Sequence, residues 1–241
     1  MKFSVTELRP NVYHFSFDSQ YFLNSTMMRL QEYYESPIEG IKGQYFSYEK
    51  FMDAYALSTE HKDFSYFTDW SGFNVPGNIV LDFYDTFKYD LLLKEKTFFE
   101  AVFLFRHGKL SGKNKDRFYV LCTYKHKGEE TALKHELSHA YWYLFPDSYA
   151  GEAKELLNTK RFLNPEVSEK AKKALLEKGY CEEVLEDELQ AYLATGSRRF
   201  LKLVLRYPDK AKLSTKFKKL FEEFDKHQRI VGINRNQKRT H

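Results

Sequence analysis

Cysteine is scarce in this chain, because Cys122 and Cys181 are the only 2 among 241 residues. They lie far apart in the sequence and give no disulfide framework of the kind that holds small secreted domains together. The N-terminal segment has no continuous apolar stretch of the secretory type, and no apolar run elsewhere is long enough to cross a bilayer. We therefore expect a soluble cytoplasmic protein with reduced thiols and no membrane partner.

The net charge and the proline content of the chain are also low. The formal net charge of +4 is too small to require a polyanionic partner for the whole molecule. The 6 prolines are scattered, and no internal repeat or low-complexity segment is present. The sequence thus has no clear linker between two domains, although its character changes near residue 95.

Aromatic residues, by contrast, make up 17% of the chain and predict an aromatic-rich interior. Before residue 95 the patterns favour helices and aromatic loops, with Asn24 and Ser47 as helix N-caps. The runs 98–105 and 118–124 flank a turn-rich segment and predict a β-hairpin.

Beyond Gly128 the pattern is helical almost to the end of the chain. Pro165, which follows an asparagine, is a good first residue for one helix. A second helix is expected to begin near Glu182 and to end at Gly196.

The segment "LKHELSHAYW", residues 133–142, combines an apolar stripe with two histidines. His135 and His139 are four residues apart and share a helix face that points away from the main core contact. This position distinguishes them from histidines buried in an apolar core. The stripe follows helical spacing and is expected to pack on the sheet; it consists of Leu133, Leu137, Ala140, Tyr141 and Leu144.

His135, Glu136 and His139 form the pattern H-E-x-x-H. Two imidazoles one helical turn apart can bind one zinc ion, and the glutamate beside them can take a proton from the zinc-bound water. The alternative is a solvated helix face that holds two histidines by chance. The amphipathic helix around the motif, directly after the predicted strands, favours the zinc site.

A catalytic zinc ion needs three protein ligands and an open position, so a third ligand must lie elsewhere. The acid-rich segment 182–188 offers several carboxylates on one predicted helix. Glu188 is expected to face inward, because its helical neighbours are apolar or aromatic, and a metal ion would justify burying its charge. Glu183 with Asp187 after it is the alternative, on a more polar ridge.

The H-E-x-x-H motif with a later E-x-x-A, Glu188 to Ala191, resembles the gluzincin class of zinc metallopeptidases, in which a glutamate on a later helix completes the metal site. The resemblance covers about residues 97–200. It implies a zincin-like α+β fold, with a small antiparallel or mixed sheet packed on the active-site helix and a mostly helical C-terminal part. Many gluzincins carry an acid four residues after the ligand glutamate, where this chain has Tyr192.

The resemblance also implies zinc-dependent hydrolysis of peptide bonds in a peptide or protein substrate. Its metal ligands would be His135, His139 and Glu188, and its general base Glu136. Tyr180 lies where several gluzincins place a tyrosine that donates to the oxyanion, so it is a candidate catalytic residue, with a packing role as the alternative.

Further expectations concern the regions around the site. Residues 1–95 are predicted to form a helical, aromatic prosegment or a cleft-forming part, and residues 96–241 the catalytic region, unless the two form one continuous domain. Zincins hold an extended substrate against an edge strand, and that role would fall to 98–105 or 118–124.

Two other functions compete with the peptidase. One is a zinc-binding regulatory or interaction protein on an inactive or autoinhibited peptidase scaffold. The other is a DNA-associated protease, which the basic tail after Asp225 would support. Such enzymes complete the metal site with a histidine, and no later histidine motif for this purpose occurs here. The simpler explanation of the basic tail is a frayed, solubilising terminus. The sequence leaves the oligomeric state open.

Overall fold

The computed structural model of the chain describes residues 3–106, 117–158, 165–177, 180, 182–195 and 209–237. The chain forms two compact units, Met1–Leu133 and Lys134–His241. The fold is α+β, as predicted, with a small mixed sheet and many helices. The change of character near residue 95 falls inside the first unit.

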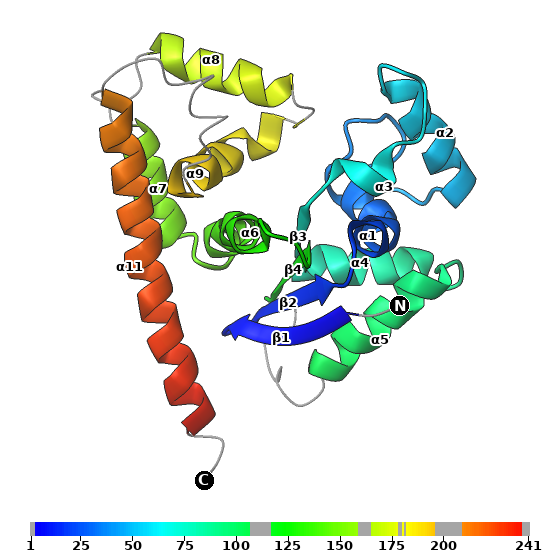
Figure 1. Ribbon diagram of the computed structural model, residues 1–241, viewed down its shortest axis with the longest axis horizontal. Coiled ribbons are helices and arrows are strands. Elements are labelled where there is room, and N and C mark those ends of the chain that lie inside the picture. Colours follow the sequence, from blue (N-terminus) through cyan, green and yellow to red (C-terminus); the bar gives the residue numbers. More distant parts are fainter. Residues whose placement is uncertain are drawn as a thin grey trace. The chain divides into compact units, whose positions relative to one another are not determined.

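The first unit contains a four-stranded sheet in the order β1-β2-β4-β3 (Figure 1). β1 (Phe3–Arg9) and β2 (Val12–Phe17) are antiparallel, and Asn11 between them has a φ of 65°, which asparagine tolerates better than most residues. β4 (Tyr119–Tyr124) runs parallel to β2 and antiparallel to β3 (Gly72–Pro76). Its residues 119–123 are all buried, as expected of a central strand.

Five helices lie wholly within the described residues of this unit, and its core is aromatic, as predicted. The side chain of Ser19 caps the first helix and that of Ser47 caps the second, which confirms the prediction for Ser47. Asn24 lies inside the first helix, fully buried, and donates to the carbonyls of Phe67 and Trp70, so its prediction as a cap was wrong. The helices are α1 (Gln20–Glu35), α2 (Tyr48–Ser58), α3 (Tyr66–Asp69), α4 (Gly77–Phe87) and α5 (Leu93–Arg106).

The predicted strand at 98–105 is part of the helix α5, so the predicted hairpin is wrong. Phe98, Phe99 and Val102 are buried while Leu104 is 72% exposed, which is the burial period of a helix. The carboxylate of Glu95 accepts a hydrogen bond from the backbone N–H of Leu92 and stabilises the start of the helix. The turn-rich segment 107–116 lies outside the described residues.

The structure also corrects the expected docking strand for a substrate. Residues 98–105 are helical, and β4 has a partner strand on each side, so neither can pair with an added strand. The edges of the sheet are β1 and β3. β3 lies in a region where the sequence patterns favoured helices and aromatic loops, so this strand was not predicted.

A buried ion pair in this unit leads to a stability prediction. Arg29 is fully buried and donates to both carboxylate oxygens of Glu95, at 2.9 and 2.6 Å, and to Asp90 at 3.1 Å. Glu95 is 2% exposed, whereas the side chain of Asp90 is 51% exposed. Removing Glu95 leaves a buried guanidinium without its main counterion, which should cost about 3–5 kcal/mol.

Urea unfolding of Glu95→Ala and Asp90→Ala tests this prediction. The exposed partner serves as the matched control, and its removal should cost only about 1 kcal/mol because water replaces its carboxylate. Equal losses in the two variants would contradict the argument from burial.

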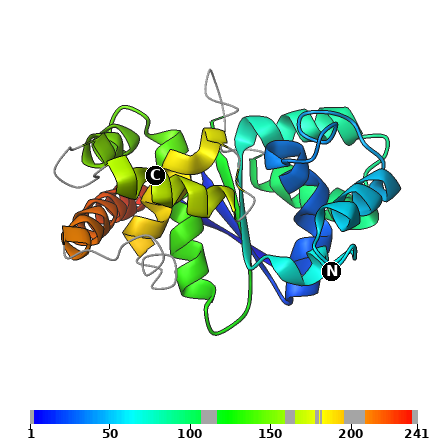
Figure 2. The same ribbon diagram turned by 90° about the horizontal axis from the view of Figure 1, so that it is seen from above.

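The second unit is built from helices along its described residues. α6 (Glu129–Leu144) begins just before the boundary, and α9 (Leu185–Thr195) contacts α7, α8 and α11. Figures 1 and 2 show α11 beside α7. The remaining elements are α7 (Tyr149–Asn158), α8 (Pro165–Leu176), a short 3-10 helix (Glu182–Val184) and α11 (Asp209–Gln237).

Pro165 opens α8 as predicted, while Gly196 lies outside the described residues. Tyr141, which was expected to pack on the sheet, has its ring against Tyr149 of α7 and Phe221 of α11. Its hydroxyl donates to Asp225, which is 7% exposed. Aromatic contacts therefore connect α6 with the helices of its own unit.

The basic tail was predicted to be frayed, but its residues up to Gln237 continue the helix α11. Gln228 is 6% exposed, and Arg229 pairs with Asp225 at 2.9 Å, so packing and a helical ion pair stabilise this part of the chain. Lys238 and Arg239 lie outside the described residues. Among the described helices, none is long and apolar enough to span a membrane.

Candidate metal centre

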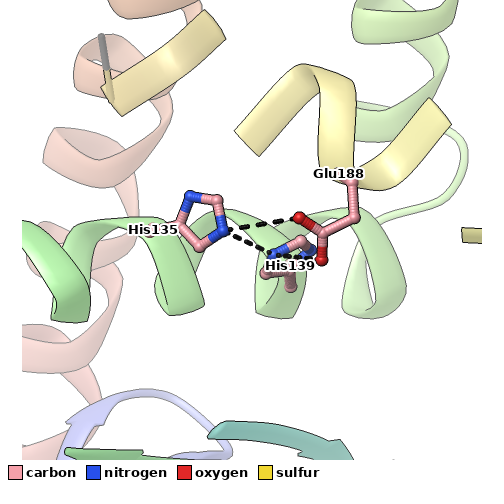
Figure 3. Close-up of side chains that lie close together, drawn as sticks. All are labelled: His135, His139 and Glu188. Atoms are coloured by element: carbon pink, nitrogen blue, oxygen red, sulfur yellow. Dashed lines mark hydrogen bonds and ion pairs between the residues drawn. The ribbon is translucent and has the colours of Figure 1, made fainter. Parts of the chain in front are cut away.

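Three side chains from two helices of the second unit converge on one point (Figure 3). His135 and His139 project from α6, and Glu188 projects from α9. Their ligand atoms all lie within 4.8 Å of one another, and no other such group of His, Cys and carboxylate side chains occurs in the described part of the chain. The structure thus brings together the three residues that the sequence predicted as metal ligands.

The helical spacing of α6 and the inward face of α9 produce this arrangement. Four residues advance an α-helix by slightly more than one turn, so the imidazoles of His135 and His139 project from the same side. Their ring centres lie 4.9 Å apart. Glu188 is 5% exposed and stands in the first turn of α9, where the helix dipole stabilises a negative charge.

The alternative ligand Glu183 is not one of the three converging residues. It lies in the 3-10 helix before α9 and is exposed to solvent. Asp187, which would have accompanied it, contacts the site directly, because its Oδ1 lies 2.9 Å from Nδ1 of His139.

Asp187 thus supplies the histidine-orienting carboxylate that the sequence did not identify. It lies one residue before Glu188, whereas the pattern of many gluzincins suggested position 192. Two adjacent acids can both contact His139 because an imidazole has two nitrogens on different sides of the ring. Asp187 lies beside Nδ1 of His139, and Oε1 of Glu188 lies 3.4 Å from Nε2. The only feature of the sequence that could have indicated this role of Asp187 is its position directly before Glu188.

Tyr192 occupies the position at which many gluzincins carry an acid, and it contacts the site through its ring. Its ring lies 4.7 Å from the ring of His135, and its hydroxyl lies 3.1 Å from that of Tyr180. Tyr180 also helps to lower the pKa of Glu188. Tyr192 therefore restricts the position of one imidazole, and Tyr180 lies close enough to Glu188 to affect its charge.

The electric field of the site favours a cation. Burial alone would lower the pKa of His139, but the negative charges of Asp187, Glu188 and Glu136 raise it well above its ordinary value. Burial alone would raise the pKa of Glu188, but His139, His135 and Tyr180 lower it. Three carboxylates thus surround two imidazoles in a largely buried space.

Glu136 lies near this cluster and is 8% exposed. Its charge contributes to the raised pKa of His139 and to that of Tyr180, for which burial and then Glu188 are the larger causes. The candidate base and the candidate oxyanion donor are therefore both within electrostatic range of the ligand candidates.

The donor atoms lie close to the spacing that a tetrahedral zinc ion requires. Bonds of about 2.0–2.2 Å to nitrogen and oxygen place the ligand atoms of such an ion roughly 3.3–3.5 Å apart. In the structure Nε2 of His139 lies 3.3 Å from Nε2 of His135 and 3.4 Å from Oε1 of Glu188. The other carboxylate oxygen, Oε2, lies 3.6 Å from Nε2 of His135, and with one ligand atom taken from each residue the three atoms lie within 4.8 Å of one another.

A second observation agrees with this fit. Oε2 of Glu188 is buried and accepts no hydrogen bond from any described residue. A buried carboxylate oxygen without a partner is costly, and a cation would remove that cost. Two imidazoles and one carboxylate suit zinc among the common divalent ions.

Searches against profiles of known protein families, curated proteins and solved structures found no match to this chain.

Proposed function

We propose that this protein is a zinc-dependent metallopeptidase of the gluzincin type, with the zincin-like arrangement that this class implies. The convergence of the donor atoms of His135, His139 and Glu188 carries the proposal, because their spacing is close to that of the protein ligands of a tetrahedral zinc ion. A bound zinc ion would supply a Lewis acid that polarises the scissile carbonyl and acidifies water. The substrate would be a peptide or a protein.

The residues around the ligands have separate tasks in this proposal. Glu136 takes the proton from the attacking water and then gives it to the leaving amine. Tyr180, whose pKa is raised well above its ordinary value by burial and by Glu188, keeps its hydroxyl proton and can donate it in a hydrogen bond to the developing oxyanion. Asp187 holds the ring of His139 in place.

A zinc-binding regulatory or interaction protein is the second candidate function. Burial favours it, because His139 is 2% exposed and Glu188 5% exposed, as in a structural site that substrates do not enter. The two functions share the metal ligands and differ in the task of Glu136, which only the peptidase needs as a base.

Metal content tests the site on which both functions depend. Protein purified without added metal and then exposed to zinc should hold about one ion per chain by elemental analysis, as a site with three ligands requires. Glu188→Ala should lose most of this zinc, since it removes one ligand. Glu183→Ala, the matched control from the same segment, should keep it, because Glu183 is exposed and is not one of the three converging ligand candidates.

Wild-type protein without zinc would contradict the proposal at its first step. Equal zinc in the two variants would show that zinc binds elsewhere on the chain.

A further inference from the structure

A chain of hydrogen bonds extends from His139 into the interior of the second unit. Oδ1 of Asp187, 2.9 Å from Nδ1 of His139, also accepts a hydrogen bond from Nε2 of Gln190 at 2.9 Å. The other end of that amide, Oε1 of Gln190, accepts from the hydroxyl of Tyr149 at 2.9 Å. Gln190 and Tyr149 are both 0% exposed, so water does not compete for the hydrogen bond between them.

The direction of donation along this chain is determined by its chemistry. An ionised carboxylate can only accept, so Asp187 requires a donor from Gln190 and a donor from His139. Nδ1 of His139 must therefore carry a proton. In a neutral imidazole the lone pair is then on Nε2, the atom that faces His135 and Glu188.

Tyr149 determines which end of the Gln190 amide meets Asp187. Its buried hydroxyl donates to Oε1, which leaves the NH₂ group to face the carboxylate. Without this hydroxyl, Oε1 would be buried with no donor. A half-turn of the amide would then place an oxygen against Asp187 and weaken the acceptor that orients His139.

We propose that Gln190 and Tyr149 are positioning residues of the metal centre, which set its zinc affinity by holding Asp187 as the acceptor for Nδ1 of His139. The inference rests on the proposed metal site and does not require peptidase activity. Neither residue touches the ligand atoms directly, and both belong to the second unit, Tyr149 to α7 and Gln190 to α9. The geometry thus extends the metal centre to a third helix.

The test compares the zinc affinity of three full-length variants with that of wild type, by competition with a chelator at fixed pH. Gln190→Leu should weaken zinc binding roughly tenfold and Tyr149→Phe roughly fivefold, at or below the lower end of what removing an orienting partner costs. Tyr141→Phe is the matched control, because it also removes the hydroxyl of a fully buried tyrosine. That hydroxyl donates to Asp225, which is not part of the series of hydrogen bonds that leads to His139. The zinc affinity of this variant should equal that of wild type.

A second measurement separates positioning from general loss of stability. In cobalt-substituted protein, the exchangeable Nδ1 proton of His139 should exchange with solvent faster in Tyr149→Phe than in Tyr141→Phe. Affinities and exchange rates that are the same in the two phenylalanine variants would overturn the inference and leave the metal site intact. Wild-type protein that binds no zinc would overturn the metal site and the inference together.

Discussion

Glu136→Gln is expected to slow peptide hydrolysis roughly 10²–10⁴-fold while the protein keeps its full zinc content. The amide has nearly the same shape as the carboxylate but cannot take a proton from water. Because Glu136 is not one of the three converging ligand candidates, zinc affinity should change little. Hydrolysis of unfolded protein or of a mixed peptide library, followed by mass spectrometry, provides the measurement.

Glu130→Gln is the matched control for this prediction. It makes the same chemical change on the same helix, at an exposed position in the first turn. Its activity should equal that of wild type, since it lies more than one turn before His135. A zinc-loaded Glu136→Gln protein as active as wild type would exclude Glu136 as the base.

The measurement also decides between the two candidate functions. A regulatory or interaction protein would bind zinc without turnover in wild type, and Glu136→Gln would leave its zinc content unchanged as well. Turnover that is present in wild type and in Glu130→Gln but absent in Glu136→Gln is an outcome that the peptidase alone predicts.

The metal ligands could be predicted from the sequence because each depends on local helical geometry. His135 and His139 share a face through their spacing alone, and Glu188 faces inward because its helical neighbours are apolar or aromatic. Asp187 was assigned to a polar ridge, and its side chain is indeed partly exposed, at 19%. Its contact with His139 depends on how α9 crosses α6, which no local pattern contains.

The fold of the first unit was less predictable, for a related reason. Phe and Val are common in strands, and this composition suggested a strand at 98–105, whereas the burial of Phe98, Phe99 and Val102 follows a helix. β3 was missed because Gly72–Pro76 contains glycine, asparagine and proline, which are common in turns and rare in strands. β2 and β4 pair in parallel across about a hundred residues, a contact that only the tertiary structure provides.

Zinc should stabilise the folded protein strongly. Residues 135 and 188 are far apart in the sequence, so the complete ligand set exists only in the folded second unit. At free zinc about 1,000 times the dissociation constant, binding to the native state alone adds about 4 kcal/mol. For a chain of this size that gain corresponds to a rise in melting temperature of roughly 8–16 °C, measured by calorimetry with and without zinc.

Two variants make the origin of this stabilisation clear. Glu188→Ala should lose most of the zinc-dependent rise, because two histidines at helical spacing bind zinc weakly without the carboxylate. Glu183→Ala should retain all of it, since Glu183 is exposed and is not one of the three converging ligand candidates. If Glu188→Ala kept the same rise as wild type, zinc would be stabilising the protein through other groups. The fit between the donor atoms of His135, His139 and Glu188 and a tetrahedral ion would then have no functional meaning.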